Sequence, residues 1–181
     1  MAPVSDLPEG RLALARLGYA NGLTAGTAEI LATSTGARLA ITLSGVSEGK
    51  HGVHLHVSGR CDAPDFMTAG GHLNPAHRLH GSDNPGGSHL GDLPNIEIGK
   101  AGTGRLSHNL STNQAELLTY LFDSDGAAVV VHAGPDDYRT DPSGNSGARI
   151  ACGVLKRTGL VWLARIRQRV IKSGLSEAFQ P

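Results

Sequence analysis

The histidines are the residues of this chain whose types and spacing most clearly indicate chemistry. Nine are present among 181 residues, and seven of them fall within residues 51–89. In the run HGVHLHV, His54 and His56 stand two residues apart, so on a strand both rings point to one face. The opposite, core-facing side is then expected to carry Val53, Leu55 and Val57. Two imidazoles placed one strand step apart can chelate a single metal ion.

A glycine-rich segment further along adds three histidines and a carboxylate, namely His72, His80, His89 and Asp92. Three imidazoles and a carboxylate are a sufficient set for tetrahedral zinc. His132, which ends the apolar run AAVVVH, is a seventh candidate. Solvated surface histidines would explain any one of these residues but not the whole group. Seven ligands are too many for one zinc ion and enough for two metals, and imidazole suits copper and zinc. Spacing alone does not divide the ligands between two ions.

The elements that must position these residues are predicted to be short strands. Alternation of apolar and polar residues, broken by glycines, predicts strands over 11–18, 26–32, 37–44, 52–58, 104–110, 127–132 and 149–155. A short helix is expected within 112–122. Residues 59–93 and 135–147 are rich in Gly, Pro, Asn and Asp and are expected to be long functional loops. Many short strands with two long loops predict an all-β Greek-key sandwich or barrel.

Composition excludes several classes of protein. Glycine accounts for 25 residues, yet no G-X-Y period or heptad repeat is present, and no apolar run reaches the length of a membrane span. The formal net charge is zero, but residues 156–181 hold six basic residues and one acidic residue. The remaining body is therefore acidic, which argues against nucleic acid as a partner.

The order of the motifs resembles that of bacterial copper/zinc superoxide dismutases. Along the chain come HGVHLH, GGHLNP, HGSDNPGGSHLGDLPN, VVVHAGPDD and GNSGARIACGV, and the bacterial likeness comes from CDAPDFMTAGGHLNP. The match implies a superoxide dismutase domain over residues 11–155 and an extension over 156–181. The family fold is an eight-stranded Greek-key β-barrel with immunoglobulin-like sandwich architecture, a metal-binding loop and an electrostatic loop.

The resemblance implies a metal for each candidate ligand. Copper is expected to be bound by His54, His56, His72 and His132. Zinc is expected to be bound by His72, His80, His89 and Asp92. His72 would thus bridge the two ions through its imidazolate. His51 matches a structural position of the family, and His77 and His108, outside the motifs, are expected to be solvated.

The implied reaction converts two superoxide anions to dioxygen and hydrogen peroxide by alternate reduction and reoxidation of copper. Arg149 and His72 are the expected catalytic groups, with Arg149 binding the anion beside copper. Asp136 matches the aspartate that links a copper histidine to a zinc histidine. Because the body is acidic, attraction of the substrate would depend on Arg149, helped by Arg139. The alternative is a carrier or buffer of copper and zinc with the same fold, which would need no substrate arginine.

The two cysteines bear on the compartment. In an intracellular protein, separated thiols such as Cys61 and Cys152 are usually small buried hydrophobes. The resemblance implies instead that they form a disulfide, which favours a periplasmic or secreted protein. The start MAPVSDLPEG lacks the features of a secretory signal, so either a leader has been removed or the protein is cytoplasmic.

The basic tail is not covered by the resemblance. If helical, it would place Trp162, Leu163, Ile166 and Val170 on one face, which suits contact with an anionic membrane surface. A frayed appendage, or a helix packed on the barrel or on a partner subunit, is the competing interpretation. A homodimer is the expected assembly.

Overall fold

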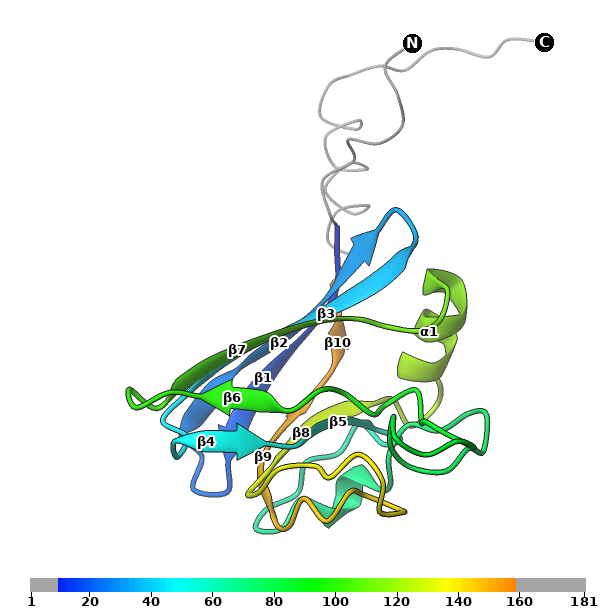
Figure 1. Ribbon diagram of the computed structural model, residues 1–181. Helices are drawn as coiled ribbons and strands as arrows, with labels where there is room; N and C mark the ends of the chain where they lie inside the picture. The colour runs from blue at the N-terminus through cyan, green and yellow to red at the C-terminus, as the bar shows by residue number, and fades with distance from the viewer. Residues whose placement is uncertain (1–9, 159–181) are drawn as a thin grey trace, which may run out of the picture.

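The computed structural model describes residues 10–158, and it is built mainly of antiparallel strands (Figure 1). The longer strands are β1 (Arg11–Tyr19), β2 (Thr24–Thr33), β3 (Gly36–Ser44), β5 (Val53–His56), β7 (Thr103–Asn109), β8 (Ala128–His132) and β9 (Arg149–Val154). Three short strands are β4 (Gly49–His51), β6 (Ile96–Ile98) and β10 (Lys156–Arg157). The helical pieces are η2 (Met67–Ala69) and α1 (Gln114–Leu121). The all-β prediction is therefore confirmed.

The strand order is that of a closed Greek-key arrangement. The main sheet runs β5-β8-β9-β1-β2-β3-β7, with β10 added beside β1, and β4 pairs with β6 in a separate ribbon. Neighbours such as β9 and β1, or β3 and β7, are distant in sequence and require crossovers. β4 leads into β5 through Gly52, and β6 turns back into β7, so the ribbon closes the gap between the two edges of the curled sheet (Figure 1).

Alternating apolar residues fill the interior of this barrel. In β3, Ala37, Leu39, Ile41 and Leu43 are buried while the residues between them face outward. Burying a Leu or Ile side chain fully contributes about 1.5–3 kcal/mol, so these inward rows are what hold the strands in register. Register also needs Gly26, because a Cβ there would lie 2.0 Å from the carbonyl oxygen of Thr42.

The predicted helix is confirmed and begins at a clear cap. The side chain of Asn113 accepts a hydrogen bond from the Glu116 amide, and its own Nδ2 donates to the Glu116 carboxylate. The first of these contacts satisfies one of the backbone amides that are otherwise unpaired at the start of a helix. Leu117 and Leu121 then point into the core.

Two local expectations differ from the structure. Val57 lies just beyond the end of β5 and is 37% exposed rather than on the core side, because the strand ends at His56. His108 is half-buried on β7 rather than solvated. Within residues 10–158, no helix has the length and apolarity that crossing a membrane requires. The predicted amphipathic helix lies outside the described residues.

Candidate metal centre

Strand β5 is the template on which the ligands are assembled. Its own residues His54 and His56 are both fully buried. The segment between β5 and β6, residues 57–95, which we call the metal-binding loop, returns twice to the same strand and forms isolated bridges between His56 and His72 and between His54 and Asp92. β8 pairs with β5 on its other side and ends at His132. Segments far apart in sequence therefore deliver their side chains to one place.

Four buried ring nitrogens converge on one side of this assembly. Within the described part of the chain, they make no hydrogen bond, and they are His54 Nδ1, His56 Nε2, His72 Nε2 and His132 Nε2. An unsatisfied buried polar atom is costly, so a cluster of four requires an explanation. Imidazole nitrogens whose lone pairs point at a common position are suited to hold a copper ion.

We call His54, His56 and His132 the copper-side rings. The second nitrogen of each of these rings makes a hydrogen bond, which fixes the tautomer. His56 Nδ1 donates to the carbonyl oxygen of Gly70 at 2.9 Å, and His132 Nδ1 donates to that of Gly147 at 3.1 Å. His54 Nε2 donates to the Asp136 carboxylate at 2.7 Å. Such contacts orient metal-ligating imidazoles and leave the opposite lone pair available.

A second cluster adjoins the first and shares His72. The Nδ1 atoms of His72, His80 and His89 lie 2.9, 3.0 and 3.1 Å from Asp92 Oδ1, and His72 Nδ1 lies 3.4 Å from His89 Nδ1. In a regular tetrahedron, edges of this size put the corners about 1.8–2.1 Å from the centre, close to the about 2.0–2.2 Å of zinc with nitrogen and oxygen ligands. The donor set and its spacing therefore fit zinc.

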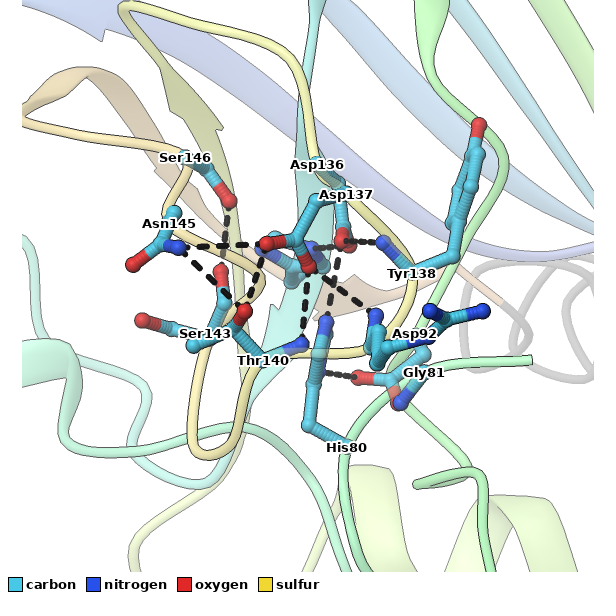
Figure 2. A network of polar contacts seen from close by, with 12 residues as sticks. His80, Gly81, Asp92, Asp136, Asp137, Tyr138, Thr140, Ser143, Asn145 and Ser146 are labelled. Atoms are coloured by element: carbon cyan, nitrogen blue, oxygen red, sulfur yellow. Dashed lines mark hydrogen bonds and ion pairs between the residues drawn. The ribbon is translucent and has the colours of Figure 1, made fainter. Parts of the chain in front are cut away.

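Asp136 joins the two clusters (Figure 2). Its Oδ2 accepts from His54 Nε2, and its Oδ1 accepts from His80 Nε2 at 3.0 Å and from the Tyr138 amide at 2.7 Å. Asn95 clamps the backbone of this residue, since its Nδ2 donates to the Asp136 carbonyl and its Oδ1 accepts from the Asp136 amide. The sequence indicated the role of Asp136 through its resemblance, whereas nothing indicated Asn95.

The loop after Asp136 is held by its neighbour Asp137 (Figure 2). The Asp137 carboxylate accepts from the Thr140 amide and hydroxyl and from Asn145 Nδ2, at 2.8, 2.6 and 3.1 Å. The Asp137 amide in turn donates to the Gly144 carbonyl at 2.9 Å. These contacts place Gly144 directly against the Asp136 carboxylate.

Burial governs the protonation of the copper-side rings. It lowers the pKa of His54 to about 3, of His56 to about 2 and of His132 to about 4. Desolvation disfavours the charged imidazolium, so these rings are neutral at neutral pH. A neutral ring is the form that binds a metal.

His80, on the zinc side, behaves in the opposite way. Burial acts to lower the pKa of His80, but hydrogen bonds to Asp136 and Asp92 outweigh it and raise the pKa of His80 to about 9. Burial acts to raise the pKa of both aspartates, but contacts with the rings hold the pKa of each well below its usual range. Two buried carboxylates thus form an anionic pocket that a cation neutralises.

Arg149 lies at the start of β9, opposite His132. Its Nη1 donates to the Phe66 carbonyl at 2.8 Å and its Nη2 to the Gly70 carbonyl at 2.7 Å. The guanidinium is half-buried; the two carbonyl oxygens do not neutralise its positive charge, and the Asp65 carboxylate, which lines the same cavity as the arginine, acts on it electrostatically. The same Gly70 oxygen that orients His56 therefore also orients the arginine.

Arg149 lines a cavity of about 790 Å³ that we call the substrate cavity, together with His72, His132, Arg78 and Asp141. Within the described residues, Arg139 is not part of its wall. The second cation is Arg78, whose amide and carbonyl are both bonded to the Asn74 side chain. Sequence reasoning missed Arg78 because it stands in no motif.

The remaining predictions concern Cys61, Cys152 and His51. The two cysteines form a disulfide across 91 positions, with Cα atoms 5.6 Å apart, which confirms the expected pairing. His51 is buried, and its ring contacts the carbonyl oxygens of His132 at 2.8 Å and Ser47 at 3.0 Å. It does not belong to either ligand cluster.

The fold and the site together define a class, a Greek-key β-barrel protein whose loops assemble a centre for two metal ions. Residues 24–155 match the family profile described as copper/zinc superoxide dismutase (SODC). The chain belongs to the copper/zinc superoxide dismutase family.

Relatives of known name support this placement. Superoxide dismutase [Cu-Zn] 1 of Aquifex aeolicus is 42% identical over 134 residues, which cover 72% of this chain and 79% of that protein. The crystal structure of a SOD-like protein from Bacillus subtilis aligns with a TM-score of 0.75 and 38% identity, covering 81% of this chain and all of that one. Cu/Zn superoxide dismutase from Brucella abortus aligns with a TM-score of 0.64 and 26% identity, covering 80% and 99%.

Proposed function

We propose that this protein is a superoxide dismutase that converts two superoxide anions and two protons to dioxygen and hydrogen peroxide. Copper is held by His54, His56, His72 and His132, and zinc by His72, His80, His89 and Asp92. The observation that carries this assignment is the pair of adjoining clusters that share one imidazole, with four lone pairs converging on one side and a tetrahedral set on the other.

The residues around these metals have separate tasks. Copper, when bound, exchanges single electrons with superoxide, while zinc supplies charge at the other nitrogen of the His72 ring without redox chemistry. Arg149 binds the anionic substrate through the face of its guanidinium that is open to the substrate cavity. His72 lines the substrate cavity, so its ring would be placed to supply one of the two protons that the reduced substrate takes up, the other coming from solvent. Asp136 keeps the rings of both sites in the required tautomer.

The test of this function is the rate of superoxide disproportionation by protein loaded with copper and zinc. We expect fast turnover that is lost when the metals are removed. Arg149→Gln is expected to retain both metals and lower kcat/KM by about 10–100-fold, because a charge-assisted hydrogen bond is worth about 1.5–3 kcal/mol. Metal analysis of each sample separates a loss of substrate binding from a loss of metal.

A carrier with the same fold gives a different result. Fully loaded protein without turnover, or an Arg149→Gln variant as active as the parent, would favour storage or delivery of metal. Arg149 argues against the carrier, since its charge faces the substrate cavity and contributes no metal ligand.

Compartment and assembly belong to the same proposal. The Cys61–Cys152 disulfide supports a periplasmic or secreted protein, because such bonds persist in oxidising compartments. We also propose a homodimer with no nucleic-acid partner. The catalytic domain is assigned to residues 11–155; β10 extends the described strands to Arg157, two residues into the proposed extension. Membrane contact through the extension concerns residues beyond the described part of the chain.

A further inference from the structure

Two cavities approach the metal centre from different parts of the fold. The substrate cavity reaches His72 and His132. The second cavity, which we call the α1 cavity, has a volume of about 710 Å³ and is lined by residues of the metal-binding loop, β7 and α1. Its wall includes Ala76, His89, Asp92, His108, Ser111 and Glu116.

The α1 cavity reaches the zinc ligands that are most exposed. Side-chain exposure is 6% for His89 and 7% for Asp92, against 3% for His72 and 0% for His80. Asp92 lines the α1 cavity and not the substrate cavity, while the copper ligand His132 lines only the substrate cavity. His89 borders both, so it stands between them. The substrate cavity also borders the zinc ligands His72 and His89, so the two cavities differ in that Asp92 lines only the α1 cavity and His132 lines only the substrate cavity.

The charges of the two cavities also differ. The α1 cavity has two carboxylates, Asp92 and Glu116, against one guanidinium, that of Arg78. The Glu116 carboxylate accepts hydrogen bonds from the Thr112 and Tyr120 hydroxyls, which keep it ionised. The substrate cavity has two guanidiniums, of Arg78 and Arg149, beside its two carboxylates. A dication is therefore more favourably placed in the α1 cavity, and an anion in the substrate cavity.

We propose that the α1 cavity is the route by which zinc reaches and leaves its site, separate from the substrate cavity that serves copper and superoxide. The proposal rests on the assignment of zinc to His72, His80, His89 and Asp92. Because one water in the liquid occupies about 30 Å³, the cavity is large enough for a hydrated ion. Glu116 and His108 offer outer ligands where that ion exchanges its waters.

The test is the rate of isotope exchange in the fully loaded protein, with zinc-67 and copper-65 supplied in solution and followed by mass spectrometry. Ala76→Trp and Ser111→Trp fill the α1 cavity from two different segments of its lining, before β6 and after β7, so one variant serves if the other folds poorly. Ala148→Trp fills the substrate cavity and is the matched control. We expect the first two to slow zinc exchange at least tenfold with unchanged copper exchange and superoxide kcat/KM. Ala148→Trp is expected to slow copper exchange and lower superoxide turnover while leaving zinc exchange unchanged.

Two outcomes would overturn the route. Zinc exchange slowed by Ala148→Trp but not by the other two variants would place its path in the substrate cavity. Zinc exchange unchanged in all three would mean that zinc leaves by opening of the whole loop. Both metals are followed without turnover, so a protein that proved inactive would contradict the proposed function and still report the path of zinc.

Discussion

Replacing both Cys61 and Cys152 by alanine is expected to lower the free energy of unfolding by about 4–5 kcal/mol. The crosslink closes 91 positions of chain, and in the chain-entropy model its loss releases that constraint on the unfolded state. Urea unfolding of metal-free protein measures the effect, since bound metal would add its own stabilisation. Alanine is chosen because Cys152 is buried in a small apolar cluster with Phe66, Ala69 and Val130, where a serine hydroxyl would lack a partner.

The reduced wild-type protein is the control for this variant. It loses the crosslink and keeps both sulfur atoms, so its stability should fall by nearly the same amount. Stability of the double variant within about 1 kcal/mol of the oxidised parent would contradict the expectation, because removal of native disulfides typically costs about 2–5 kcal/mol. Since Phe66 accepts from Arg149, loss of the bond should also loosen the guanidinium.

Gly144→Ala is expected to weaken zinc binding by at least about 10–100-fold, the range seen when contacts that orient metal ligands are lost. A Cβ at this position would lie 1.9 Å from Asp136 Oδ1 and 2.7 Å from His80 Nε2. The carboxylate would have to move, and with it the ring that it holds. The backbone there has φ +65, so alanine adds about 1–2 kcal/mol of conformational cost. Competition with a chromophoric chelator measures the zinc affinity.

Gly22→Ala is the control variant. It separates the steric clash of a Cβ at position 144 from the conformational cost of alanine at a positive φ. Gly22 has φ +83, and a Cβ there would meet nothing within 4 Å. This variant should lose stability by a similar conformational amount and keep the zinc affinity of the parent. Equal zinc affinities in Gly144→Ala and Gly22→Ala would show that the position of the Asp136 carboxylate does not depend on the absence of a side chain at residue 144.

Much of this architecture could be predicted from local patterns. Alternation located seven strands because each has four to ten residues, with inward rows such as Leu39 and Ile41 in β3. β4, β6 and β10 were missed because two or three residues are too few to show a period. Val57 was misplaced because alternation does not reveal where a strand ends.

The site could be predicted only in part from the sequence. Residue type and spacing identified the seven candidate ligands, but their division between two clusters depends on how the loop returns to β5, which no local pattern encodes. The expected place of Asp136 came only from the resemblance. Asn95 and Gly144 act through contacts with residues distant in sequence, and Arg78 is placed in the cavity wall by the course of its loop, so no motif could indicate them.

The carbonyl oxygen of Gly70 accepts hydrogen bonds from both His56 and Arg149. This one backbone atom thus orients both the metal ligand His56 and Arg149, which would bind the anion, so the two side chains cannot be adjusted independently. Any attempt to redesign the enzyme for a larger oxyanion by reshaping this turn would also disturb the coordination geometry. New specificity would have to be built from lining residues that have no bond to that shared oxygen, such as Ser143.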